Sequence, residues 1–184
     1  MPFTPFHFGP GLAIKSAVPR AFSWTTFIAA QILIDFETVY YWLHHRYPRH
    51  HFFHSFAGAT LAGLTAACCY LIVIRVMSVS FPSLTTFLFE LPLDMESEFS
   101  TSAVLWGGLI GGMSHPLLDA IVHPDVHPFL PFSNHNPLFG LLAPGRMEIL
   151  CMVAGALGLV VLRINTGSRR HRDTKTEPTA IRNR

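Results

Sequence analysis

Apolar residues form four long runs along the chain, and polar or proline-containing segments separate them. A helix needs about 20 predominantly apolar residues to cross a lipid bilayer. Inside the bilayer only helices and closed barrels satisfy their own backbone polar groups, so uninterrupted apolar runs of this length predict helices. We therefore expect four transmembrane helices, at Ala21–Leu43, His54–Ser78, Thr101–His123 and Met147–Asn165.

The remaining segments complete this picture. Leu12–Val18 is long enough only for a short re-entrant or interfacial helix, and the five prolines of Pro124–Gly145 exclude a continuous helix there. The polar, basic residues from 166 onwards indicate a disordered tail. The predicted fold class is an all-α, polytopic helical membrane protein with a single embedded domain at 1–165 and a cytoplasmic tail at 166–184.

Composition supports a membrane protein and excludes other classes. Half of the residues are apolar and 13% are charged, whereas soluble proteins carry about 25% charged residues. The net charge of +2 arises mainly in the tail, so the chain offers no basic surface for nucleic acid. The expected partner is the lipid bilayer, and the sequence does not indicate an oligomeric state.

The distribution of lysine and arginine predicts the orientation. Lys15 and Arg20 precede the first apolar run, and Arg169, Arg170, Arg172 and Lys175 follow the fourth. Positively charged residues are enriched on the cytoplasmic side of membrane helices. We therefore expect both termini in the cytoplasm and the histidine-rich and proline-rich loops together on the outer side.

Four glycines in the third apolar run form two overlapping small-xxx-small pairs, Gly107 with Gly111 and Gly108 with Gly112. Such pairs allow two helices to approach closely in lipid. The spacing matches neither a Walker loop nor a dinucleotide-binding loop, so we interpret these glycines as helix-packing positions.

Histidines and acids inside the apolar segments are the strongest functional signal. The chain has eleven histidines, and the acids Asp35, Glu37 and Asp119 lie inside the first and third predicted spans. Ionisable residues at membrane depth are costly and usually face an interior cavity with a partner. A bound metal ion would satisfy carboxylates and imidazoles together.

Spacing favours the same interpretation. His115, Asp119 and His123 repeat every four residues, which places them on one face of a helix, and a helix that includes His50 and His54 would do the same. Together they could form a site for zinc, manganese or iron. Structural hydrogen bonding by the same side chains is the alternative.

Four short motifs occur together in a recognisable order: Thr4-Pro5-Phe6-His7, Ile34-Asp35-Phe36-Glu37, His50-His51-Phe52-Phe53-His54-Ser55 and Ser114-His115-Pro116-Leu117-Leu118-Asp119. In this respect residues 1 to about 140 resemble the bacterial YdjM-like family of predicted inner-membrane metal-dependent hydrolases. The resemblance implies a multi-helix protein of the bacterial inner membrane with a His/Asp metal site.

Carried over by position, the resemblance implies that five residues are metal ligands: His7, Asp35, His54, His115 and Asp119. The chain departs from the family pattern at Arg49, where the family often has histidine, so His50 or His51 must substitute, and we favour His50. The loop side offers further candidates in His123, Asp125 and His127.

The predicted function is a membrane-embedded hydrolase that uses one or two divalent ions, zinc above all, on an ester or phosphoester of an amphiphilic or lipid substrate. Glu37 or Asp125 is the predicted general base. Two non-enzymatic alternatives are a metal carrier and a histidine-based pH sensor. A helical assembly subunit with vestigial ligands is a third.

Overall fold

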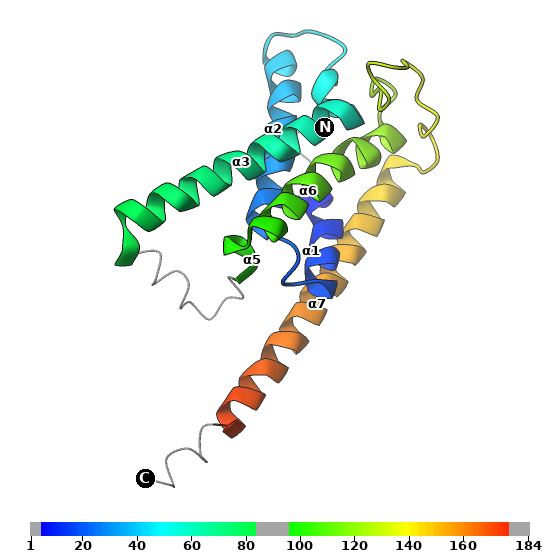
Figure 1. The fold of residues 1–184 in the computed structure, drawn as a ribbon. Helices are drawn as coiled ribbons and strands as arrows, with labels where there is room; N and C mark the ends of the chain where they lie inside the picture. The colour runs from blue at the N-terminus through cyan, green and yellow to red at the C-terminus, as the bar shows by residue number, and fades with distance from the viewer. Residues whose placement is uncertain (1–4, 84–95, 177–184) are drawn as a thin grey trace, which may run out of the picture.

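The computed structural model describes residues 5–83 and 96–176, with side chains described up to residue 165 in the last helix. In these ranges all the regular structure is helical, as predicted (Figure 1). Two single 3-10 turns accompany six α-helices. The elements in chain order are η1 (Pro5–His7), α1 (Phe8–Ala17), α2 (Trp24–Leu43), η2 (Phe52–His54), α3 (Phe56–Ser80), α5 (Glu96–Phe99), α6 (Thr101–Val122) and α7 (Pro144–Thr176).

Helix α6 lies at the centre, between α2 on one side and α3 on the other. Its glycines make both contacts close. A side chain at Gly108 or Gly112 would collide with the backbone of α3, and one at Gly107 or Gly111 would collide with the backbone of α2. The two small-xxx-small pairs therefore serve two different neighbours, which confirms the predicted packing role.

Helix α1 packs chiefly against α7 (Figure 1). Small residues again set the distance, because a Cβ at Gly9 would collide with the Cys151 carbonyl and one at Gly158 with the backbone of Leu12. With ten residues α1 is about 15 Å long, half of what a bilayer requires. It starts earlier than the predicted Leu12–Val18, and its first turn lies beside the middle of the bundle.

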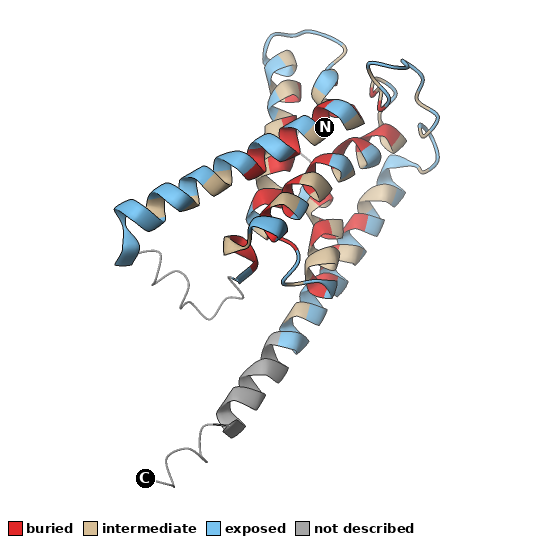
Figure 2. Ribbon diagram, in the orientation of Figure 1, coloured by how far each residue is buried: buried red, intermediate tan, exposed pale blue. Residues whose placement is uncertain are grey.

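Helices occupy all four predicted spans, but they differ in composition. Of the described helices, α3 and the Pro144–Asn165 part of α7 are long and apolar enough to cross a membrane. Acids lower the hydropathy of α2, and glycines with polar residues lower that of α6. Of the four long helices α6 holds the most buried residues, and those of α3 all lie between Gly58 and Ala67, so that α3 beyond this part and α7 are largely exposed (Figure 2).

Two helix boundaries differ clearly from the prediction. Helix α3 begins at Phe56 instead of His54, because Ser55 accepts a hydrogen bond from Gly58 N–H and caps the helix there. Helix α7 continues to Thr176, so the chain is helical over 166–176, where we predicted disorder. Residues 1–4 and 177–184 lie outside the described residues, so the predicted cytoplasmic position of both termini stays a prediction.

The end of the bundle where α2 begins contains a buried ionic network. Glu98 accepts hydrogen bonds from Ser23 Oγ at 2.6 Å and from the backbone N–H groups of Trp24 at 2.9 Å and Thr25 at 3.3 Å. Lys15 Nζ lies 3.7 Å from the same carboxylate and 2.5 Å from Ser97 Oγ. This network ties α1, α2 and α5 together, and every acceptor in it faces a donor.

Candidate metal centre

Asp119 lies at the centre of a buried histidine cluster at the other end of the bundle. Its Oδ1 is 3.3 Å from His7 Nε2, and its Oδ2 is 3.2 Å from His115 Nε2 and 3.6 Å from His54 Nε2. All four side chains are less than one tenth exposed. Elements far apart in the sequence supply them, since η1 carries His7, η2 carries His54 and α6 carries the other two.

The spacing of these atoms suits a metal ion. Bonds of 2.0–2.1 Å in a tetrahedral zinc site place neighbouring ligand atoms about 3.4 Å apart. The pairs of Asp119 with His7 and with His115 are close to that separation. Four groups of three could hold an ion with all ligand atoms within 4.8 Å of one another, namely His7–His115–Asp119, Asp35–His54–His115, His50–His54–Asp119 and His50–His123–Asp125.

The tautomer of His115 is fixed by a chain of hydrogen bonds across α2 and α6. Ser114 Oγ donates to the Gly111 carbonyl at 3.2 Å, so it accepts from Gln31 Nε2 at 3.1 Å. The carbonyl oxygen of the Gln31 amide therefore faces His115 Nδ1, and because this oxygen only accepts, Nδ1 carries the proton. In the neutral ring the Nε2 atom of His115 then has a lone pair.

That lone pair points at two carboxylates. His115 Nε2 lies 3.2 Å from Asp119 Oδ2 and 3.4 Å from Asp35 Oδ1, yet it makes no hydrogen bond within the described residues, and the ring is fully buried. Three acceptors that converge in a buried site repel one another unless a cation lies between them. Either a second proton on His115 or a metal ion can supply that charge.

His54 is oriented in the same way by Glu37. The Glu37 carboxylate lies 3.1 Å from His54 Nδ1 and accepts hydrogen bonds from the backbone N–H groups of His51 and Phe53. This places Nε2 of His54 toward Asp119 and toward the Thr38 hydroxyl at 3.2 Å. Carboxylates that hold the far nitrogen of a histidine are typical partners of metal-ligating histidines.

Asp125 orients His50 as Glu37 orients His54. Its Oδ2 lies 2.9 Å from His50 Nδ1 and accepts a hydrogen bond from Arg49 N–H at 3.2 Å. Burial acts to raise the pKa of Asp125, but the neighbouring His50 outweighs it and lowers the pKa below the usual value. The carboxylate is therefore kept ionised beside the imidazole.

The remaining predicted ligands lie at the edge of the cluster. His123 follows the last turn of α6, with Nε2 at 3.9 Å from Asp119 Oδ1 and its ring 4.7 Å from that of His50. It is one quarter exposed. His50 and His54 do meet, with ring centroids 4.6 Å apart, but not through a shared helix as predicted, because α3 starts only at Phe56.

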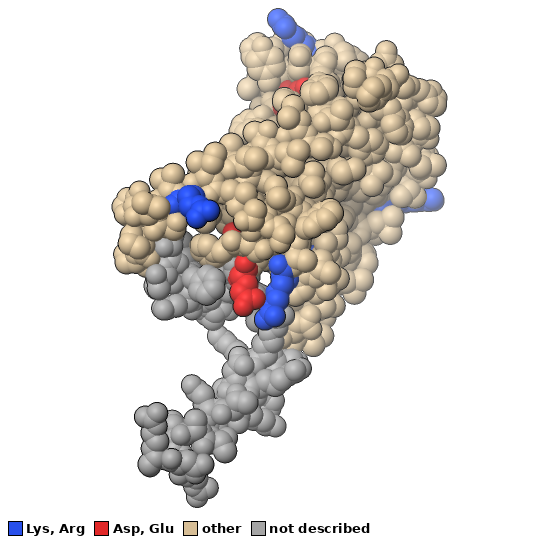
Figure 3. Space-filling model, in the orientation of Figure 1, with Lys and Arg blue, Asp and Glu red and all other residues tan. Residues whose placement is uncertain are grey.

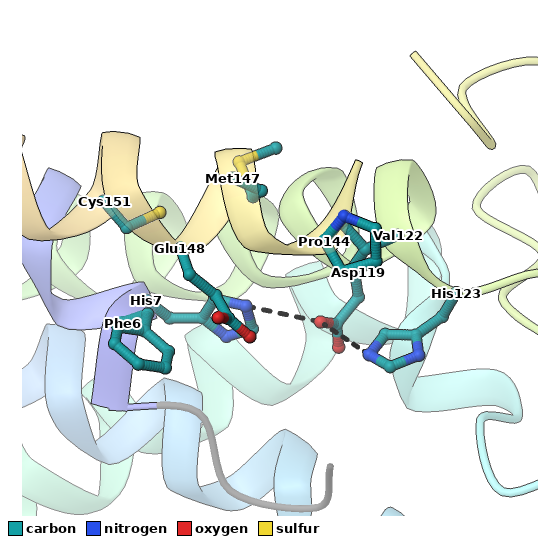
Figure 4. A pocket seen from close by; sticks show the side chains of 9 residues that line it. All are labelled: Phe6, His7, Asp119, Val122, His123, Pro144, Met147, Glu148 and Cys151. Carbon is teal, nitrogen blue, oxygen red and sulfur yellow. Dashed lines mark ion pairs between the residues drawn. The ribbon is translucent and has the colours of Figure 1, made fainter. Parts of the chain in front are cut away.

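A pocket opens beside the cluster between α6 and the first turns of α7 (Figure 4). It encloses a cavity of about 250 Å³, and Figure 4 shows Glu148 of α7 on the same side as His7. A second cavity, of about 300 Å³, reaches His50, His123 and Asp125 from the loop side. The cluster is thus accessible from two directions.

All seven predicted metal ligands thus gather in or around one cluster. The two predicted bases, Glu37 and Asp125, each contact the Nδ1 atom of a histidine in that cluster. Sequence analysis missed Gln31, Ser114 and Glu148. A lone glutamine within an apolar span was the available signal for Gln31, since a polar amide buried in an apolar environment also needs a hydrogen-bond partner. Nothing in the spacing marks Glu148, which lies in a different helix from the rest.

Charged side chains are otherwise scarce on the described surface, and the face in Figure 3 is almost entirely uncharged between its two ends.

No family model, curated protein or solved structure matches this chain. The functional argument therefore depends on the residues and their geometry.

Proposed function

We propose that this protein is a membrane-embedded metal-dependent hydrolase that acts on an ester or phosphoester of an amphiphilic or lipid substrate. The observation that carries the proposal is the fully buried Nε2 atom of His115, which lies between Asp35 and Asp119 without a hydrogen-bond partner in the described residues. A zinc ion held by His7, His115 and Asp119 would supply the missing positive charge, and manganese or iron has the same ligand preference.

The group His50–His54–Asp119 offers a second position that shares Asp119 with the first. A carboxylate that bridges two ions is compatible with two-metal hydrolysis, in which the ions lie about 3.5–4 Å apart. A bound ion would lower the pKa of a water ligand and polarise the scissile ester. The residues Gln31, Glu37 and Asp125 would hold the imidazoles in the orientation that this site needs.

The architecture favours an enzyme over a metal carrier, the main alternative. Below the cluster the core consists of fully buried apolar side chains such as Phe27, Ala30 and Val104. A carrier needs polar groups that lead through to both faces. Beside these apolar side chains Thr26 is buried, but its hydroxyl is already bound to the Val104 carbonyl at 2.9 Å. We propose that the four long helices span the bacterial inner membrane, as the resemblance to the YdjM-like family implies.

Elemental mass spectrometry on detergent-purified protein tests this proposal. We expect near-stoichiometric zinc in the wild type and its loss in the His54→Ala, Asp119→Ala double variant. His45→Ala, His135→Ala is the matched control, because both histidines are exposed and outside the cluster. Absence of metal in the wild type after zinc, manganese and iron reloading would overturn the proposal.

Hydrolysis is measured on the same preparations with p-nitrophenyl esters and p-nitrophenyl phosphodiesters that carry an alkyl chain. We expect release of p-nitrophenol only from preparations that retain the ion. Equal turnover by the double variant would show that the cluster is not the reacting site.

A further inference from the structure

The pocket between α6 and α7 combines polar and apolar side chains. Its polar lining residues are His7, Asp119, His123 and Glu148, and Figure 4 shows Glu148 on the same side as His7. The rest of the lining is apolar and consists of Phe6, Val122, Pro144, Met147 and Cys151. A ligand with a polar head and an apolar chain matches this arrangement.

The size of the pocket limits what it can hold. Cavities that enclose a whole drug-sized ligand measure about 300–1,000 Å³, and this one measures about 250 Å³. It can take a head group and the first part of one chain, so the rest of the chain must lie outside.

Helix α7 provides the route for that chain. Only 17% of its most apolar stretch is buried, and Ile149 and Leu150, next to the pocket, are more than half exposed. If α7 faces lipid, the pocket is open toward the acyl chains of the bilayer. The second cavity lies on the loop side, and its lining residues include Thr38, Arg49, His50 and Asp125, which suits exit of a water-soluble product.

Glu148 is the acid best placed to act on a ligand in this pocket. Glu37 and Asp125 each accept backbone hydrogen bonds and hold a histidine Nδ1. Within the described residues the carboxylate of Glu148 has no hydrogen-bond or ion-pair partner, and it lines the cavity together with His7 and Asp119.

We propose that this pocket binds single-chain amphiphiles with a phosphodiester head, and that Glu148 is the catalytic residue that accepts the proton of the attacking water. The inference rests on the proposed hydrolase function and extends it to the substrate class. The water oxygen forms a new bond to phosphorus while the bond from phosphorus to the leaving oxygen breaks. Glu148 takes a proton from the water and returns it to the leaving oxygen, so the products are a phosphomonoester and an alcohol.

Photolabelling tests binding independently of turnover. Zinc-loaded full-length protein in nanodiscs is irradiated with a dodecyl phosphodiester that carries a diazirine near its head, and labelled residues are mapped by mass spectrometry. We expect labelling of Met147 and Cys151 that excess unlabelled dodecylphosphocholine abolishes. Labels on Ile149 and Leu150 serve as the internal control, because contact with bulk lipid is not saturable. Labelling confined to those exposed positions would overturn the binding site.

A filled-pocket variant tests the same site by kinetics. Met147→Trp should raise KM for a dodecyl p-nitrophenyl phosphodiester at least tenfold and leave KM for the methyl analogue within twofold. Leu150→Trp adds the same bulk on an exposed face of α7 and should change neither value. Unchanged KM for the dodecyl substrate in Met147→Trp would exclude chain binding in this pocket.

Glu148→Gln tests the proton acceptor. We expect kcat to fall by about 10²- to 10⁴-fold, with KM within twofold and full metal content. Wild-type kcat in this variant would exclude Glu148 from the reaction. These outcomes differ from failure of the proposed function, in which the wild type itself would bind no ion and release no p-nitrophenol.

Discussion

The two ends of the bundle both bury charged groups, but they balance them differently. At one end Glu98 receives donors from Ser23, Trp24 and Thr25 and an ammonium group from Lys15. At the other end Asp119 faces only imidazoles, and within the described residues no lysine or arginine side chain pairs with it.

The difference shows which buried charges the fold satisfies by itself. A buried ion pair with complete hydrogen bonding is structural and needs nothing further. A cluster in which acceptors outnumber donors remains costly until a cation enters. The predictions below separate these two cases, because each variant should disturb stability or ion binding but not both equally.

The largest effect is expected from Asp119→Asn. Both groups that contain Asp119 lose their shared carboxylate, so the ion content and hydrolysis should fall below detection. Elemental mass spectrometry and p-nitrophenol release measure the two losses. Retention of a stoichiometric ion in this variant would show that Asp119 is not a ligand.

Glu98→Ala should lower the stability of the fold and leave ion binding unchanged. Removal of one partner of a buried ion pair costs about 3–5 kcal/mol, so the thermal midpoint in detergent should fall clearly. The ion content per folded molecule should be unchanged. Loss of the ion at temperatures where the variant is folded would contradict the separation of the two ends.

Removal of the ion from the wild type by a chelator should have the next largest effect on the thermal midpoint. Binding at 100 times the dissociation constant stabilises a folded protein by about 2.7 kcal/mol. The thermal midpoint should therefore fall on chelation and recover on zinc addition. Asp119→Asn serves as the control, since its midpoint should respond to neither treatment.

Gln31→Leu should have a moderate effect. It removes the acceptor that fixes the His115 tautomer while it keeps a similar side-chain volume. Loss of such an orienting partner weakens metal affinity about 10- to 100-fold. Competition with a zinc-binding dye measures the affinity, and an unchanged value would mean that Gln31 does not position His115.

Arg20→Ala should have the smallest effect. Arg20 Nε lies 3.0 Å from Glu96, but both side chains are more than half exposed. Surface pairs contribute about 0–1 kcal/mol, so the thermal midpoint should shift little and the ion content should not change. A large shift would show that this pair belongs to the buried network of Lys15 and Glu98.

Sequence patterns predicted the features that depend on residues close together in the chain, namely the helices and the side chains that share a helix face. The four apolar runs located α2, α3, α6 and α7, and the four-residue interval of His115 and Asp119 placed both on the inner face of one helix. The prediction for His50 and His54 was right about proximity and wrong about its cause. Their rings meet because the chain turns through η2 before α3 begins at Phe56.

Contacts between distant segments could not be predicted in this way. The pairing of Gln31 with His115 joins positions 84 residues apart, and no interval in the sequence encodes it. The role of Glu37 could not be predicted either. Its acidity suggested a general base, whereas its contact with His54 Nδ1 depends on the path of the loop. Spacing identified the ligand candidates but not the groups that orient them.

The close packing of α1 against α7 has a consequence for biosynthesis. His7 is synthesised well before α7, yet α1, which follows His7 directly, finds its main partner in that later helix. A chain released before α7 would lack the surface that holds His7 beside Asp119. The cluster around Asp119 can therefore reach its full arrangement only after α7 has been synthesised.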